Sequence, residues 1–151
     1  MPSRVLAIDF GTKRIGLAVS DPLALTAQGL ETLERTQLGR DLDRICLLIE
    51  EYEVGRVVLG NPISARGEET EMSRRVASFA EKLRRRITCP VLLWDERLTS
   101  AQAGRVLREA GLGIEKRRRA RDRVAAVLLL SSYLDYLAGQ SLHPPDGESA
   151  P

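Results

Sequence analysis

Cysteine, histidine and aromatic residues are scarce in this sequence of 151 residues, and long apolar runs are missing. The two cysteines, Cys46 and Cys89, form no C-x-x-C pair and have no histidine nearby, which excludes a disulfide framework and a zinc site of the usual cysteine and histidine spacing. No apolar run approaches the roughly 18 residues of a membrane span, and the N-terminus lacks a signal-peptide pattern. We therefore expect a reduced, soluble, cytoplasmic protein with no membrane partner.

The length is typical of one domain, and we find no internal repeat. Residues 140–151 contain three prolines and almost no apolar side chain, a composition that cannot build a core. The sequence therefore predicts one folded domain over residues 1–139, followed by a disordered tail over 140–151.

Hydrophobic periodicity predicts an α/β fold. The first three extended segments can pair as antiparallel hairpins, whereas the later strands are joined through helices and must pair in parallel. We expect a mixed five-stranded sheet flanked by helices. The expected strands cover residues 3–9, 14–20, 30–34, 56–60 and 91–95, and the expected helices cover residues 37–53, 71–85 and 99–110, with a last helix beginning at residue 122.

Three acidic positions lie at the edges of core elements. Asp9 ends an apolar strand, Asp95 and Glu96 follow another, and Asp122 begins an apolar helix. Because ligands gather at the carboxyl ends of parallel strands, we expect these acids to converge. Adjacent strand residues point to opposite faces, which favours Glu96 over Asp95 as a ligand. Asp122 could equally serve as an N-terminal cap of its helix.

Three carboxylates without a histidine or cysteine set favour Mg²⁺ or Mn²⁺. Sites of this kind act most often on phosphates, where two ions activate water and stabilise the leaving oxygen. We therefore take Asp9, Glu96 and Asp122 as candidate catalytic residues and metal ligands. Nearby side chains that could contact the substrate phosphates, or could be ordinary surface residues, are Thr12, Lys13, Arg14 and Arg97.

Basic residues are clustered although the net charge is only +2. The cluster at residues 82–86 closes a predicted helix, where it complements the helix dipole. The cluster at residues 116–121 comes just before the helix expected at Asp122, where like charges repel unless an anion binds among them. We favour a phosphate-binding role for this second cluster over a merely solvated loop. Its candidate substrate contacts are Lys116, Arg118 and Arg121.

Four ordered motifs resemble those of the YqgF family, also called RuvX. They are the segments at residues 7–16 (AIDFGTKRIG), 60–62 (GNP), 95–100 (DERLTS) and 122–126 (DRVAA), and the resemblance covers about residues 3–138. It implies a ribonuclease H-like fold, and a nuclease that matures the 5′ end of the 16S ribosomal RNA precursor. Carried over by motif, the acidic residues of the family fall on Asp9, Glu96 and Asp122.

The sequence departs from the pattern of resolvases similar in fold. The strand ending at Asn61 carries no acid where those resolvases have one, and Ala125 stands where a second aspartate would help. A resolvase also needs a dimer to cut two strands symmetrically, and the sequence leaves monomer and homodimer open. We therefore expect RNA as the substrate, with single-stranded or branched DNA as a further candidate.

Three alternatives to an RNA nuclease remain open. They are a Holliday-junction-type DNA nuclease, a non-catalytic RNA-binding module, and an ATPase, because the turn from Asp9 to Thr12 is similar to the first phosphate loop of actin-like ATPases. Those ATPases need a second lobe, for which this chain is too short. With aromatic residues at 4% and Trp94 and Phe10 expected in the core, we also expect little base stacking and weak sequence preference.

Overall fold

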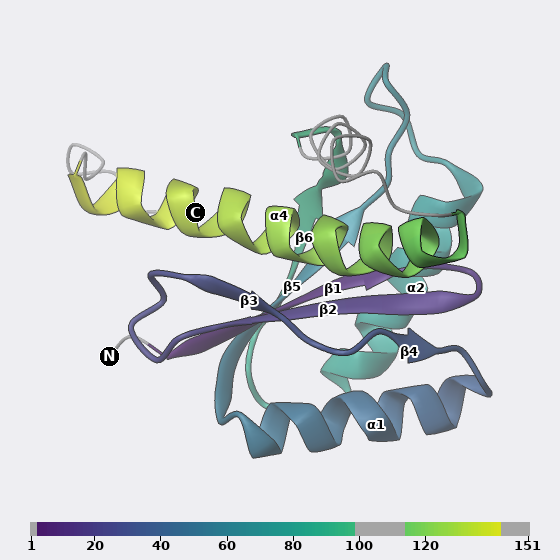
Figure 1. Ribbon diagram of the computed structural model, residues 1–151, viewed down its shortest axis with the longest axis horizontal. Coiled ribbons are helices and arrows are strands. Elements are labelled where there is room, and N and C mark those ends of the chain that lie inside the picture. Colours follow the sequence, from purple (N-terminus) through teal and green to yellow (C-terminus); the bar gives the residue numbers. More distant parts are fainter. Residues whose placement is uncertain (1–2, 99–113, 143–151) are drawn as a thin grey trace.

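The first two strands form a hairpin whose turn carries two of the candidate residues, Thr12 and Lys13. The computed structural model describes residues 3–98 and 114–142 (Figure 1). Strand β1 (Arg4–Phe10) pairs antiparallel with β2 (Arg14–Ser20), with Asp9 opposite Gly16. Both strands are buried over most of their length, as expected for central strands that are covered on both faces. The two strands lie as the sequence predicts.

The sheet is mixed, in the order β3-β2-β1-β5-β6. Where one extended segment was expected at residues 30–34, the structure has two short strands, β4 (Leu33–Glu34) inside that range and β3 (Ala27–Gly29) before it, and both pair antiparallel with β2. In the described part of the chain the sheet therefore has six strands rather than the expected five. Strands β5 (Val54–Asn61) and β6 (Val91–Asp95) add in parallel to β1. The expected α/β fold with a mixed sheet is confirmed. Because β1, β5 and β6 are parallel, their carboxyl ends meet at one edge.

Helices cover both faces of the sheet (Figure 1). Helices α1 (Leu38–Glu51) and α2 (Glu71–Arg84) lie on one face, and α4 (Ile114–Leu142) lies on the other. Helix α2 begins with a capping box, in which the Thr70 side chain accepts a hydrogen bond from the Ser73 backbone and the Ser73 hydroxyl accepts one from the Thr70 backbone. None of the helices in the described part of the chain is long and apolar enough to cross a membrane.

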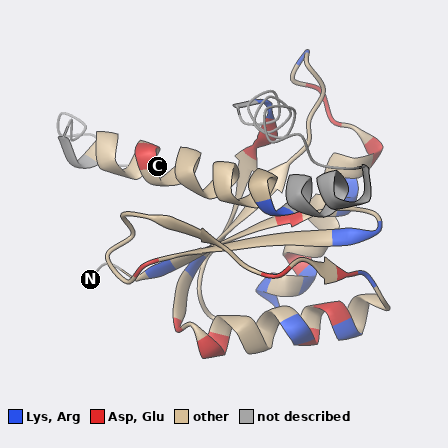
Figure 2. Cartoon of the chain, in the orientation of Figure 1, with Lys and Arg blue, Asp and Glu red and all other residues tan. Residues whose placement is uncertain are grey.

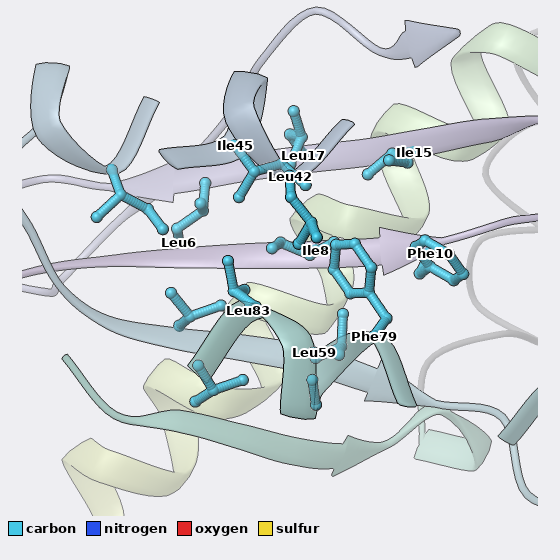
Figure 3. Packing of buried hydrophobic residues seen from close by; sticks show 14 of the residues in the cluster. Leu6, Ile8, Phe10, Ile15, Leu17, Leu42, Ile45, Leu59, Phe79 and Leu83 are labelled. Atoms are coloured by element: carbon cyan, nitrogen blue, oxygen red, sulfur yellow. The ribbon is translucent and has the colours of Figure 1, made fainter. Parts of the chain in front are cut away.

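Two apolar cores lie on opposite faces of the sheet. The larger core joins alternate residues of β1 and β2 to α1 and α2, and the ring of Phe10 stacks on that of Phe79 with centroids 4.3 Å apart (Figure 3). The smaller core lies under α4 and contains Ala7, Ala18 and Ala126, all fully buried. Their short side chains let α4 pack close to β1 and β2. Alternation between the two cores therefore shows which face each strand residue occupies.

A buried carboxylate fixes the hairpin turn relative to α1. Asp41 is fully buried and accepts hydrogen bonds from the Thr36 hydroxyl at 2.9 Å and from Arg35 Nε at 3.2 Å. Arg35 also donates to the carbonyl oxygen of Gly11 at 3.2 Å, and its guanidinium lies 4.5 Å from the centroid of the Phe10 ring. Burial alone would raise the pKa of Asp41, but the hydrogen bonds from Thr36 and the pairing with Arg35 outweigh it and lower that pKa.

Helix α4 corrects one sequence expectation. We expected the helix to begin at Asp122 after a basic loop, whereas α4 begins at Ile114 and includes residues 116–121. No glycine or proline lies between Ile114 and Asp122, and Lys, Arg and Ala are strong helix formers, so the helix continues through the basic run. At its other end, α4 continues to Leu142 rather than stopping at residue 139. The helix expected at 99–110 and most of the predicted tail, 143–151, lie outside the described residues.

Candidate active site

Asp9 projects from the carboxyl end of β1 towards the face covered by α4. Ile8 and Phe10 belong to the larger core, on the face of α1 and α2, whereas Ala7 belongs to the core under α4. Successive strand residues alternate between faces, so Asp9 shares the face of Ala7. It is half-buried and lies next to the turn of the hairpin. The strand therefore holds this carboxylate at the sheet edge beneath the helix.

Glu96 comes to the same face because a glycine leaves room for it. It is the first residue after β6 and opens a short 3-10 helix, η1 (Glu96–Leu98). Its side chain lies over Gly60 of β5, so that a Cβ atom at Gly60 would be 2.5 Å from Glu96 Oε1 and 2.9 Å from its Cγ. Because β5 lies between β6 and β1, the glycine lets the Glu96 side chain extend across β5 towards Asp9.

The carboxyl groups of Glu96 and Asp9 are joined by a hydrogen bond. Burial, this hydrogen bond and the negative charges of Asp9 and Asp95 raise the pKa of Glu96 to about 9. Two carboxylates cannot approach this closely unless a proton or a cation lies between them. Near neutral pH a proton therefore joins the pair when no cation is bound.

Asp95 faces away from this pair and is held by an arginine. Asp95 follows Val91 and Leu93 in the alternation of β6, and Val91 belongs to the core on the face of α1 and α2. The Asp95 carboxylate accepts hydrogen bonds from Arg97 Nη2 at 2.6 Å and from Arg97 Nε at 2.8 Å. This hydrogen bonding with Arg97 lowers the pKa of Asp95. Of the two adjacent acids, the structure thus brings Glu96 to Asp9 and engages Asp95 with Arg97.

Asn61 stands at the end of β5, where the sequence carries no acid, and it does not contribute to this face. It follows Val57 and Leu59 in the alternation of the strand, and both of these belong to the larger core on the opposite face. The Oδ1 atom of Asn61 is buried and has no hydrogen-bond partner within residues 3–98 and the described side chains of α4. At β5, the feature that matters for the candidate site is the missing side chain of Gly60.

Asp122 lies on α4, which packs against β1 and β2, but its side chain is outside the described part of the structure. Ala126, one turn later, is fully buried against the sheet, and Ala125 is half-buried. The described residues contain no cluster of three potential metal ligands. They supply the Asp9 and Glu96 carboxylates, a donor set of oxygen atoms that fits a hard cation such as Mg²⁺ or Mn²⁺.

Basic residues occur in the hairpin between β1 and β2 and in the part of α4 that is not drawn in grey (Figure 2). Thr12 and Lys13 are exposed in the turn, and Arg14 begins β2 on the same face as Asp9. The predictions from sequence missed Arg123, which is exposed and lies across Gly29 of β3, so that a Cβ atom there would be 2.7 Å from Arg123 Cγ. Its position directly after Asp122 was the available signal. The side chains of Lys116, Arg118 and Arg121 lie outside the described residues.

Comparison with known proteins gives relatives along most of the chain. One, from Koribacter versatilis, is 47% identical over 132 residues, covering 87% of this chain and 86% of the relative. A second, from Agathobacter rectalis, is 43% identical and covers 89% of this chain and 96% of the relative. Both are described as predicted pre-16S rRNA nucleases.

Solved structures with a similar fold include Holliday junction resolvases, and at under 25% identity they show the fold alone. The yeast mitochondrial resolvase has a TM-score of 0.58 at 15% identity, with 94% of this chain and 82% of that chain covered. RuvC of Thermus thermophilus bound to a Holliday junction has a TM-score of 0.53 at 18% identity, with 91% and 96% covered. The profile of the family described as "RuvX: Holliday junction resolvase" matches residues 3–136, so this chain belongs to the RuvX family.

Proposed function

We propose that this protein is a nuclease that hydrolyses phosphodiester bonds in RNA and processes the 5′ end of the 16S ribosomal RNA precursor. The observation that carries the proposal is the Asp9–Glu96 carboxyl pair at the carboxyl ends of parallel strands, where α/β proteins bind ligands. The names of the relatives supply the substrate. Such a substrate would place the protein in the cytoplasm.

The reaction would depend on Mg²⁺ or Mn²⁺ held by Asp9, Glu96 and Asp122. Divalent ions in such sites lower the pKa of bound water and neutralise the charge that develops on the leaving oxygen. The role of the chain is to present carboxylates at a fixed spacing. Gly60 leaves room for Glu96, and the shared proton of Asp9 and Glu96 must leave before a cation can bind between them.

Basic residues around the candidate site would hold the RNA backbone. Arg14 and Arg123 border the site on the side of β2 and β4, while Thr12 and Lys13 are exposed at its rim. We assign the phosphate contacts further along the strand to Arg97 and to Lys116, Arg118 and Arg121 in the first turns of α4. Binding that relies on phosphate contacts weakens steeply as the salt concentration rises.

Two other functions use the same fold. The solved structures that share it include RuvC in complex with a Holliday junction, which favours a nuclease acting on branched DNA as the second candidate. Such a nuclease would act as a homodimer, whereas an RNA nuclease can act as a monomer. An RNA-binding module without catalysis is the third candidate, and the raised pKa of Glu96 argues against it because such perturbed carboxyls concentrate at active sites.

The deciding experiment is a cleavage assay with the purified full-length protein. Labelled single-stranded RNA with the sequence of the precursor 5′ end is incubated with Mn²⁺ or Mg²⁺, next to a four-way DNA junction. We expect cleavage of the RNA that is lost in Asp9→Asn and retained in the control Asp135→Asn, an exposed aspartate on α4. Cleavage of the junction alone would support the second candidate, and tight RNA binding without cleavage under either ion would support the third.

A further inference from the structure

A pocket of about 320 Å³ lies beside the candidate active site. It is lined by two cations, two carboxylates and a threonine, namely Arg14, Arg123, Glu31, Glu34 and Thr32. Arg14 is two residues from Gly16, the register partner of Asp9, and shares the face of Asp9. A nucleotide adjacent to one bound at Asp9 and Glu96 can therefore reach the pocket.

The walls of the pocket come from three elements. In the antiparallel register of β2 and β4, Arg14 lies opposite Glu34, so the two side chains are on the same face of the sheet. Arg123 comes down from α4 across Gly29, where only a glycine leaves room for it. Within the described part of the chain, no ion pair involves the carboxylates of Glu31 and Glu34, and carboxylate oxygen atoms accept hydrogen bonds.

Thr32 adds a polar group that the protein itself does not satisfy. Its hydroxyl is buried and has no hydrogen-bond partner among the residues that the structure describes. A buried hydroxyl without a partner costs free energy, and natural proteins pair nearly all such groups. Thr32 is among the residues that line the pocket. A ligand in the pocket would then supply the missing partner.

The charges of the pocket restrict the ligand. A bare phosphate would be attracted by Arg14 and Arg123 but repelled by Glu31 and Glu34. A ligand that fits all four charged side chains must carry an anionic group for the arginines and, close to it, a hydrogen-bond donor for a carboxylate. In RNA the 2′-hydroxyl is on the carbon next to the one that bears the 3′-phosphate, and it can both donate and accept. DNA carries the phosphate without this donor.

We propose that the pocket recognises a ribose 2′-hydroxyl together with its neighbouring phosphate, so that the protein distinguishes RNA from DNA. Glu34, assisted by Glu31, accepts the hydrogen bond from the 2′-hydroxyl, and Thr32 pairs with the same sugar. Arg14 and Arg123 hold the phosphate. This inference rests on the proposed function, because it assumes that the strand passing the pocket is the one bound at Asp9 and Glu96.

The test measures binding rather than cleavage. Fluorescence anisotropy with EDTA present gives the Kd of the full-length protein for three labelled single strands of one sequence: RNA, DNA, and RNA with 2′-O-methyl groups. The methyl group removes the donor and keeps the oxygen. We expect RNA to bind about tenfold more tightly than either of the others, the effect of one hydrogen bond to a charged group. Equal affinity for the three strands would overturn the proposal.

Substitutions in the pocket test whether the preference for RNA over DNA arises there. Glu34→Ala and Thr32→Val should each bring the ratio of DNA to RNA Kd down to about 3 or less, since each removes one partner of the sugar. Glu51→Ala removes an exposed charge at the far end of α1 and should leave the ratio unchanged. Thr32→Val should not lower the thermal unfolding midpoint, because it removes a hydroxyl that has no partner. A ratio unchanged in both pocket variants would refute the role of the pocket.

The binding test of the pocket and the cleavage test of the nuclease proposal can fail independently. If Asp9→Asn abolishes RNA cleavage while the pocket variants keep the full RNA preference, the protein is a nuclease and the inference about this pocket is wrong. If the preference depends on Thr32 and Glu34 and the protein cleaves nothing, the pocket assignment holds and the nuclease proposal fails. The two measurements share no readout, since binding is recorded without divalent ions.

Discussion

The Glu96 carboxyl group is hydrogen-bonded to the carboxyl group of Asp9 across the carboxyl-terminal edge of the sheet. The two residues follow different strands, and β5 separates those strands. Glu96 reaches over Gly60 to make the contact. This relationship has consequences for stability, for activity and for the effect of divalent ions, and each can be measured.

The first prediction concerns the pH dependence of stability without divalent ions. The pKa of Glu96 is raised from 4.5 to about 9, so between these values the folded protein keeps a proton that the unfolded chain has lost. The free energy of unfolding should therefore fall as the pH rises through this range. Glu96→Gln carries no titrating group at this position. Between pH 6 and 9 its free energy of unfolding should therefore fall by at least about 1 kcal/mol less than that of the wild type. Urea unfolding in EDTA measures both proteins.

Divalent ions provide the control for this first prediction. Mn²⁺ or Mg²⁺ replaces the shared proton, so saturating ion should stabilise the wild type more at pH 8.5 than at pH 6, while Glu96→Gln gains less. If the wild type and Glu96→Gln show parallel pH profiles and equal gains from the ion, the raised pKa of Glu96 does not govern either effect.

The second prediction concerns Gly60. In Gly60→Ala the new methyl group would lie 2.5 Å from Glu96 Oε1, so the Glu96 side chain must move away from Asp9. We expect RNA cleavage to drop by a factor of about 100, because a displacement of about 1 Å at a reacting group costs that much. Single-turnover cleavage rates measure the change. Gly39→Ala is the matched control: a Cβ atom at Gly39 meets nothing within 4 Å, so cleavage should stay unchanged.

The third prediction separates the two adjacent acids. Glu96→Gln should lower the cleavage rate by at least about 100-fold, because Glu96 is proposed as a metal ligand. Asp95→Asn should keep the rate within about tenfold, because Asp95 is engaged by Arg97 on the other face. Cleavage rates of the two variants under identical Mn²⁺ concentrations give the comparison. A larger loss in Asp95→Asn than in Glu96→Gln would contradict the assignment of Glu96.

The fourth prediction concerns Asp41, which holds the hairpin turn through Arg35. The lowered pKa of Asp41 means that its stabilising effect is present above its unfolded pKa of about 3.8 and is lost as the pH falls further. Asp41→Asn should lower the free energy of unfolding by about 2 kcal/mol at pH 7 and should show a flatter acid limb. Denaturant unfolding from pH 2.5 to 7 measures this.

Asp43 serves as the control for Asp41. It is exposed on the same helix and pairs with Arg86 at the surface. Asp43→Asn should change the free energy of unfolding by less than about 1 kcal/mol. An equal loss in both variants would mean that the burial of Asp41 is not the cause.

The β1–β2 hairpin and helices α1 and α2 could be predicted because local patterns determine them. Strand β2 has the predicted bounds, 14–20, because its apolar residues are bounded by a glycine-containing turn and by Asp21. The start of α4 could not be predicted in this way. Charged residues 116–121 suggested a loop, yet Lys and Arg are good helix formers, and packing of Ala126 and Leu130 on the sheet holds the helix.

In the candidate site, too, some features follow from local sequence patterns and others from how the elements pack. The sequence alone determined that carboxylates stand at the ends of two strands, because residue types and strand periodicity are local properties. Parallel strand ends already predicted that Glu96 and Asp9 converge, but only the tertiary structure showed how Glu96 reaches Asp9: it crosses β5 over the missing side chain of Gly60. The tertiary structure likewise decided that Arg123 and Glu34 share a pocket with Arg14. Contacts between elements distant in the sequence depend on how those elements pack, which no local pattern specifies.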